Sequence, residues 1–220
     1  MGWLMLWVLG CSKSPVCPEG MVWIEGGVVP MGVVTPTRTW HAPARDATVK
    51  SYCIDQYEYP NTKGQLPQVQ VSWEAATMLC ETQSKRLCTS AEWERACAGT
   101  TRRAYAYGPT RNKETCNTPI EDGPGSPPFP VAASGAHEAC ISPEGVADLN
   151  GNVSEWVSDP WTGMPEPFNA TAKVDPNTWR TLRGGTMWAQ TFYGQDCTSR
   201  HGHIKTDQHL DDGFRCCKTP

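Results

Sequence analysis

Residues 85–99 read Lys-Arg-Leu-Cys-Thr-Ser-Ala-Glu-Trp-Glu-Arg-Ala-Cys-Ala-Gly. Thr89 and Glu92 stand three residues apart, which is the spacing of a capping box at the start of a helix. Gly99 is the residue type that commonly ends one. The segment therefore predicts a short helix with one apolar side, made by Trp93, Ala96 and Cys97.

Other short elements flank this helix. Ser72 can cap an earlier helix, and apolar residues recur there at helical spacing at Trp73, Ala76, Leu79 and Cys80. Residues 21–27 predict an apolar strand that ends in a Gly-Gly turn. Further strand candidates are Val49–Asp55, Ser154–Val157, Thr181–Arg183 and Gly213–Cys216. Residues 108–130 are rich in turn formers, so we expect an irregular excursion there. Together these elements predict one α+β domain with two main helices, short strands and many ordered loops.

The composition disfavours several classes of protein. The chain has 220 residues and a net charge of −4, and its 19 Lys and Arg form no basic block, which argues against nucleic acid or an anionic membrane surface as a partner. Its 20 Gly and 19 Pro favour a loop-rich fold. Its 11 Cys are typical of an oxidising compartment. A cytosolic enzyme, a long helical bundle and a disordered tail are therefore disfavoured.

The first residues predict export. Residues 3–9 form an apolar run that is too short to span a bilayer but long enough for a signal peptide. Residues 8–11, Val-Leu-Gly-Cys, resemble the lipobox of bacterial lipoproteins, in which the cysteine, here Cys11, is lipidated. The alternative is an ordinary signal peptide with Cys11 paired elsewhere. The expected segments are a lipoprotein-type signal peptide over residues 1–10, a lipidated tether over 11–20 and the folded domain over 21–217.

The parity of the cysteines agrees with lipidation of Cys11. Their count is odd, so ten remain if Cys11 carries lipid, which is enough for five bridges with none left over. No two cysteines have the C-x₂-C spacing of a zinc site. We therefore expect a domain cross-linked by disulfides, each of which stabilises the fold by about 2–4 kcal/mol.

Six segments, taken together and in order, resemble the formylglycine-generating enzyme family, also called the sulfatase-modifying factor domain. The segments are residues 21–27 with Met31-Gly32, 71–76, 85–99, 149–157, 182–186 and 213–216. The resemblance implies a single-domain variant of the C-type-lectin-like fold. It looks closest to a secreted, cysteine-rich branch.

Members that make formylglycine hold copper(I) with two cysteines shortly after an Arg-Gly-Gly-Ser motif, because soft thiolates suit that ion. Here residues 183–186 read Arg-Gly-Gly-Thr, and Ala189 and Gly194 stand at the two cysteine positions. Neither residue can bind copper. The resemblance therefore implies that no catalytic residue is present, that copper is not a cofactor, and that a Cys-x-Pro-x-Arg peptide is not converted to the aldehyde.

The resemblance also implies the disulfides Cys80–Cys216 and Cys97–Cys197. A disulfide between Cys116 and Cys140 would constrain the irregular segment of residues 108–130. The pairing of the other four stays open, and one possibility is Cys88–Cys217 with Cys17–Cys53.

Residues 148–155 resemble a calcium loop of the family. The resemblance implies side-chain oxygens from Asp148 and Glu155 and backbone carbonyls from Gly151 and Val153, ligands of the hard kind that calcium prefers. The alternative is an Asn-Gly turn without metal. We expect calcium as a structural cofactor.

Three histidines follow Cys197 in an H-x-H-x₅-H pattern, at His201, His203 and His209. Imidazole suits zinc and iron, so a metal site is one interpretation. The interpretation that we favour from sequence is three solvated loop histidines. Capping and salt bridges are the roles that we expect for Glu58, Glu92 and Glu94.

These features lead to one functional hypothesis and two alternatives. We expect a bacterial envelope lipoprotein, lipid-anchored at the outer membrane, whose domain recognises an envelope protein or glycan through loops on a rigid scaffold. The residues expected at the ligand surface are Trp188, Phe192, Tyr193 and Arg200. The alternatives are a metal-dependent oxidase that uses the histidines, and an inert structural domain.

Overall fold

The structure is a computed structural model that describes residues 16–36, 41–118, 130–163, 174–185 and 194–220. Its helices are α1 (Trp73–Thr82) and α2 (Ser90–Ala98). Its strands are β1 (Met21–Ile24), β2 (Gly27–Met31), β3 (Arg45–Val49), β4 (Tyr52–Asp55), β5 (Arg86–Leu87), β6 (Ser154–Pro160), β7 (Trp179–Arg183), β8 (Arg200–Ile204), β9 (Asp212–Phe214) and β10 (Cys216–Lys218).

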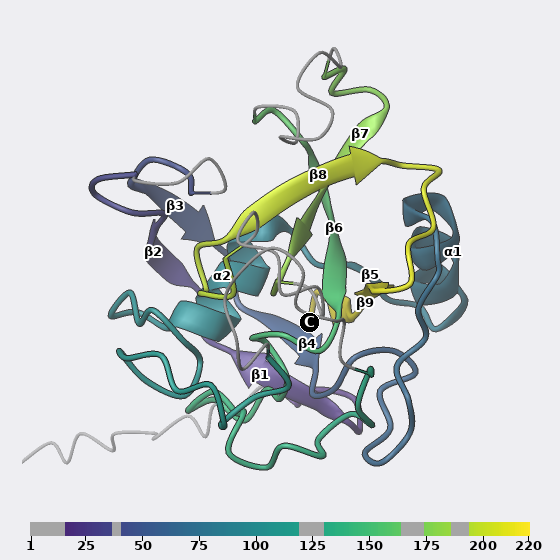
Figure 1. Ribbon diagram of the computed structural model, residues 1–220, viewed down its shortest axis with the longest axis horizontal. Helices are drawn as coiled ribbons and strands as arrows, with labels where there is room; N and C mark the ends of the chain where they lie inside the picture. Colours follow the sequence, from purple (N-terminus) through teal and green to yellow (C-terminus); the bar gives the residue numbers. More distant parts are fainter. Residues whose placement is uncertain (1–15, 37–40, 119–129, 164–173, 186–193) are drawn as a thin grey trace, which may run out of the picture.

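The strands form two four-stranded sheets and one hairpin. The first sheet has the order β1-β4-β10-β5, and the second has the order β8-β7-β6-β9. The hairpin pairs β2 with β3. In Figure 1, α1 and α2 lie on opposite sides of β6, and both helices contact that strand. The mixed α+β class expected from sequence is therefore confirmed.

Both helices begin at the predicted caps. The Ser72 hydroxyl accepts a hydrogen bond from the Ala75 N–H at 3.2 Å at the start of α1. In α2 the Thr89 hydroxyl accepts from the Glu92 N–H at 3.1 Å, and the Glu92 carboxylate accepts from the Thr89 N–H at 2.8 Å. The capping box is therefore complete, and it satisfies N–H groups that a helix start otherwise leaves open.

The strand candidates need two corrections. Val49–Asp55 is not one strand, because Val49 ends β3 and β4 begins only at Tyr52. Gly213–Cys216 is divided at Arg215, since β9 belongs to one sheet and β10 to the other. Both corrections arise from strand pairing between distant segments, which residue type alone does not specify.

Two apolar clusters fill the interior. One surrounds Trp93 of α2 and includes Ile24, Ile54 and Leu149, all fully buried. The other joins Trp156, Leu182 and Phe214 to Ala76 of α1. Burial of these large side chains supplies much of the folding free energy of a chain with few aliphatic residues.

Five disulfides tie the sheets and helices together: Cys17–Cys53, Cys80–Cys216, Cys88–Cys217, Cys97–Cys197 and Cys116–Cys140. The pairs include those that the family resemblance implies, and the four cysteines left open adopt the pairing given as one possibility. Three of the bridges close loops of 100 residues or more. In the chain-entropy account each such bridge stabilises the fold by about 4–5 kcal/mol.

Neither helix of the described segments has the length and apolarity needed to cross a bilayer.

Candidate functional site

The cysteines of the described segments are all bridged. Each of the ten from Cys17 onward belongs to a disulfide. No cysteine occurs in the sequence between Gly185 and Asp196, the interval where the family places its copper ligands. Of the two positions that replace those ligands, Gly194 is described and Ala189 lies outside the described residues, as does Cys11. The structure therefore provides no thiolate for copper(I) in the parts it describes.

The predicted calcium loop is buried and tightly held. The Asp148 carboxylate accepts a hydrogen bond from the Gly135 N–H at 2.6 Å, and burial raises its pKa. At Gly151 φ is +89°, and an added Cβ would lie 2.4 Å from the Asn117 carbonyl oxygen. A side chain is therefore excluded at Gly151 by both conformation and space. Val153, the other predicted carbonyl donor, is fully buried.

Glu155 has a partner that the sequence did not suggest. Its two carboxylate oxygens accept hydrogen bonds from the Arg215 guanidinium, both at 2.7 Å, and one also accepts from the Trp93 indole N–H at 2.7 Å. Both side chains of this ion pair are at most 1% exposed. Calcium binding by Asp148 and Glu155 stays a prediction, and the carboxylate of Glu155 already has a structural role.

Glu58 departs from the expected capping or salt-bridge role. It is fully buried and accepts hydrogen bonds from the neutral groups of Ser134 at 2.6 Å and Asn152 at 2.8 Å. Burial and the nearby Asp148 raise its pKa to about 8. Glu58 therefore holds a proton in the folded protein at neutral pH.

The other two carboxylates have the expected kinds of role. Glu92 completes the α2 capping box and forms a salt bridge with Arg86 at 2.6 Å. Glu94 forms a buried ion pair with Arg183 and accepts a hydrogen bond from the Gly32 N–H at 2.6 Å.

The histidine pattern forms a different arrangement from the one favoured by sequence. His201 and His203 lie on β8 and are buried, so they are not solvated loop residues; only His209 is on the exposed loop. Alternate residues of a strand point to one face, which places both imidazoles together. The physical reason for the error is that β8 is held by pairing with β7, opposite Leu182 and Arg180.

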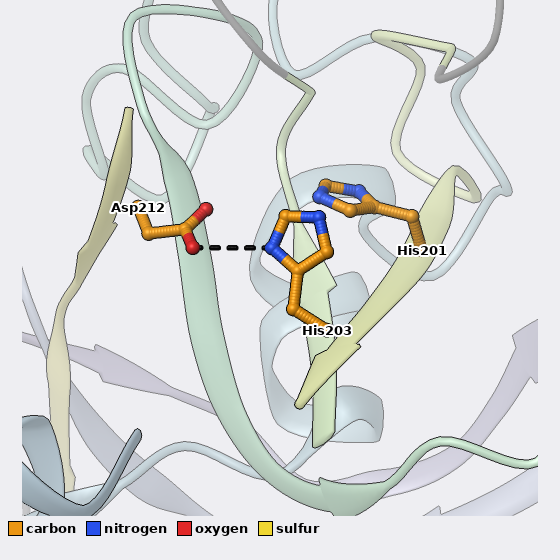
Figure 2. Close-up of side chains that lie close together, drawn as sticks. All are labelled: His201, His203 and Asp212. Carbon is orange, nitrogen blue, oxygen red and sulfur yellow. Dashed lines mark hydrogen bonds and ion pairs between the residues drawn. The ribbon is translucent and has the colours of Figure 1, made fainter. Parts of the chain in front are cut away.

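Asp212 of β9 joins the two buried histidines. One ligand atom from each of His201, His203 and Asp212 lies within 4.8 Å of the others. Figure 2 shows the Asp212 carboxylate facing the His203 ring, with His201 on the other side of that ring, and the His203 Nδ1 lies 3.1 Å from the Asp212 Oδ2. Burial and the two other histidines lower the pKa of His201 well below its usual value. We call these three residues the His–Asp cluster.

A pocket rich in arginine includes Arg200, the first residue of β8. It has a volume of about 410 Å³. Its lining comes from β2, the segment 42–45, α2, Thr162 and the adjoining ends of β7 and β8. Its charged residues are Arg45, Arg183, Arg200 and Glu94. We call it the arginine pocket, and its lining carries more positive than negative charge.

Two arginines of this pocket have unsatisfied donors. The Arg183 guanidinium is paired with Glu94 and donates to the Ser199 carbonyl at 2.9 Å, but its buried Nε–H has no hydrogen-bond acceptor in the part of the chain that the structure describes. The buried Nε–H of Arg200 has none either. Burial lowers the pKa of Arg200, and Arg183 and Arg45 lower it further by repulsion. The lining nevertheless has three guanidinium groups against one carboxylate, and this balance of charge favours an anionic group as a ligand.

The predicted ligand surface is described only in part. Trp188, Phe192 and Tyr193 lie outside the described residues. Arg200 is described: its guanidinium lies 5.0 Å from the ring centroid of Trp161, and it lines the arginine pocket. The chain leaves β7 for residues 186–193 immediately after Arg183, Gly184 and Gly185. Arg183, the last residue of β7, also lines the arginine pocket.

Comparison with known proteins finds one family. Sulfatase-modifying factor enzyme 1-like domains match residues 59–220. The chain is 31% identical over 159 residues to serine/threonine-protein kinase pkn1 of Chlamydia caviae, which covers 69% of this chain and 24% of that protein. It is 31% identical over 166 residues to the formylglycine-generating enzyme of Mus musculus, which covers 68% of this chain and 43% of the enzyme. The chain thus spans less than half the length of both relatives.

Solved structures share the fold over nearly the whole chain. PvdO from Pseudomonas aeruginosa has a TM-score of 0.68 at 18% identity, with 91% of this chain and 94% of that chain covered. Treponema denticola variable protein 1 has a TM-score of 0.68 at 16% identity, with 91% and 95% covered. CarF has a TM-score of 0.66 at 17% identity, with 93% and 100% covered. These similarities show the fold, which is the C-type-lectin-like fold expected from sequence.

Proposed function

Since the chain belongs to the family of sulfatase-modifying factor enzyme 1-like domains, we propose that it is a recognition domain of that family which has lost formylglycine-generating chemistry. The observation that carries the proposal is the bridging of every cysteine from Cys17 onward. Copper(I) needs soft sulfur ligands, and a cysteine in a disulfide has no thiolate to offer. The sequence also lacks cysteine at Ala189 and Gly194.

The arginine pocket supports recognition of an acidic ligand. Guanidinium groups in a partly enclosed cavity of net positive charge bind carboxylate, sulfate or phosphate groups strongly, because charged hydrogen bonds are stronger than neutral ones. The ligand that we propose is an envelope protein or glycan that places one acidic group in the pocket. The residues expected at the rest of its surface are Trp188, Phe192 and Tyr193, which sequence alone supports.

The proposed setting is the bacterial envelope, with the domain exported and lipid-anchored through Cys11. Five disulfides fit an oxidising compartment such as the periplasm or cell surface. Those bridges use ten of the 11 cysteines, which leaves Cys11 for the lipid. Incorporation of a radiolabelled fatty acid by the expressed protein, and its loss in Cys11→Ser, tests the anchor.

Binding to an array of acidic and neutral glycans and peptides tests the recognition role. We expect the native protein to bind acidic members, and Arg200→Gln to weaken that binding at least tenfold. The matched control is Arg180→Gln, because Arg180 stacks on Trp73 and is not part of the pocket lining. Equal binding by the native protein and Arg200→Gln would remove the pocket from the proposal. Formation of the aldehyde on a Cys-x-Pro-x-Arg peptide would overturn the loss of formylglycine-generating chemistry.

A metal-dependent oxidase is the second candidate function. The specific observation in its favour is the convergence of His201, His203 and Asp212, because two imidazoles and a carboxylate with open positions are typical of non-haem iron oxygenases. Oxygen consumption by the Fe²⁺-supplemented protein, with envelope extract as the source of substrate, tests this candidate. Consumption that persists in Asp212→Asn would contradict it.

A further inference from the structure

Two strands bring the residues of the His–Asp cluster together. His201 and His203 come from β8, and Asp212 comes from β9 at the other edge of the same sheet. The short loop that joins these strands carries His209. The His203 and His209 ring centroids are 4.2 Å apart, and the His209 Nδ1 is 3.7 Å from the Asp212 Oδ2. His209 therefore lies next to His203 and Asp212, beside the three side chains whose ligand atoms converge.

Asp212 lacks a full set of partners. It is completely buried, and among the described residues its Oδ1 has no hydrogen-bond donor. Within the described segments its ion-pair partners are His203 and His209, both through the Oδ2. A buried carboxylate oxygen without a donor is unfavourable, and a bound cation would satisfy it.

We propose that His201, His203 and Asp212 bind a divalent transition-metal ion, with His209 as a fourth ligand on the solvent side. The site does not depend on the recognition function proposed above. Calcium prefers oxygen ligands, and copper(I) prefers thiolates. The proposed site offers two imidazole nitrogens and a carboxylate oxygen, which suit ions such as Zn²⁺ and Fe²⁺.

The distances agree with such a site after small movements. Metal bonds to imidazole nitrogen and carboxylate oxygen are about 2.0–2.2 Å, which puts ligand atoms of a tetrahedral site about 3.3 Å apart. The His203 Nδ1 and Asp212 Oδ2 are already 3.1 Å apart. The wider separations, up to 4.8 Å, close by rotation of an imidazole about its side-chain bonds.

The surroundings of the cluster allow entry and provide support. His209 has a side chain that is 49% exposed, so an ion can reach the cluster from solvent on that side. On the inner side, the Trp156 ring contacts His203 edge-on at 6.1 Å between centroids. This contact with Trp156 helps to orient the His203 ring.

Titration of the chelator-treated, disulfide-intact protein with Zn²⁺, in competition with a chromogenic chelator, tests the proposal. We expect one equivalent to bind. Co²⁺ in place of Zn²⁺ should give the visible absorption of a four- or five-coordinate nitrogen and oxygen site. Failure to bind one equivalent of either ion would overturn the proposal.

Variants place the ion at the cluster. Asp212→Asn and His203→Gln should each weaken Zn²⁺ binding at least tenfold. His137→Gln is the matched control, because His137 lies in a separate loop and is not part of the cluster. Zn²⁺ affinity that is unchanged in both cluster variants, or lost equally in His137→Gln, would refute the assignment.

A measurement on the native protein covers the case in which a cluster variant fails to fold. The imidazole nitrogen resonances of His201 and His203 should shift on addition of one equivalent of Zn²⁺, and those of His41 and His137 should not. A shift confined to His41 or His137 would locate the ion elsewhere and exclude the cluster.

Discussion

The Arg215 guanidinium binds the Glu155 carboxylate side-on in the protein interior: its Nε–H and an Nη2–H each donate a hydrogen bond of 2.7 Å to one carboxylate oxygen. Arg215, which lies between β9 and β10, also donates to the carbonyl oxygens of Asp55 and Ala147. It therefore links the junction of these two strands to two other buried segments. The planar fork of arginine matches a carboxylate in this geometry, which lysine cannot do. The pair therefore fixes how the two sheets are joined.

Loss of Arg215 should be strongly destabilising. We expect Arg215→Ala to lower the free energy of unfolding by about 3–5 kcal/mol, because it leaves the Glu155 charge buried and unpaired. Arg215→Lys should recover only part of this loss. Arg86→Ala serves as the control, since Arg86 pairs with Glu92 at 39% side-chain exposure and should cost about 1 kcal/mol or less. Urea unfolding with intact disulfides measures the three variants, and equal losses for Arg86→Ala and Arg215→Ala would contradict the argument.

Calcium should stabilise the protein through Asp148 if the loop binds it. A calcium ion at residues 148–155 would offset the repulsion between the Asp148 and Glu155 carboxylates. We expect calcium to raise the melting temperature of the native protein and a chelator to reverse that gain, with no effect on Asp148→Ala. Glu138→Ala, at a side chain 81% exposed, is the control. Metal analysis that finds no calcium above background in the purified native protein would end the expectation.

Glu58 should make the protein less stable at alkaline pH. Its pKa is about 8 in the folded protein against an ordinary 4.5, so between these values the folded state keeps a proton that the unfolded state releases. Stability from this group is therefore fully present below about pH 4.5 and is lost as the pH rises through about 8. Glu58→Gln resembles the protonated acid and removes that loss. We expect the variant to match the native protein at pH 5 and to exceed it by at least about 1 kcal/mol at pH 9 in urea unfolding. A constant difference across that range would contradict the raised pKa.

The elements that sequence predicted well are those whose causes are local. The capping box at Thr89 and the stop at Gly99 bound α2 without help from distant residues, and the structure keeps both. Cysteine parity likewise anticipated that the ten cysteines from Cys17 onward would pair. The helix caps depend on a few neighbouring residues, and the cysteine argument depends only on the number of cysteines. Both can therefore be read from a single sequence.

What sequence missed depends on contacts between distant segments. β8 has no apolar alternation, and it is a strand because β7 pairs with it and Trp161 covers Gly202, where an added Cβ would lie 2.1 Å from the indole ring. Asp212 lies beside the histidines because β9 belongs to the same sheet as β8, a relationship between distant segments. The one signal available was the i, i+2 spacing of His201 and His203, which would have placed them on one face had the segment been read as a strand.

Bridging of the cysteines should make the denatured protein unreactive to thiol reagents. With Cys11 lipidated or replaced by serine, we expect no titratable thiol without reductant and ten after full reduction. The reason is that the ten cysteines from Cys17 onward form five disulfides. Reaction with a chromogenic disulfide in guanidinium chloride gives the count. Two thiols before reduction would mean that one bridge is absent, and they would reopen the question of a sulfur-bound metal.

Asp196 should lose its stabilising role in acid. Burial alone would raise its pKa, but hydrogen bonds from His41, Thr198 and Ser199 outweigh burial and hold the pKa at about 2, below the ordinary 3.8. For a lowered carboxyl pKa the stability is present above about pH 4 and is lost as the pH falls toward 2. We expect Asp196→Asn to be less stable than the native protein by about 2 kcal/mol at pH 7, with the difference shrinking between pH 4 and 2. Asp46→Asn, at a side chain 70% exposed, should show no such change. Urea unfolding at pH 7, 4 and 2.5 measures both variants, and a difference for Asp196→Asn that stays constant down to pH 2.5 would show that the lost stability comes from packing and not from its charge.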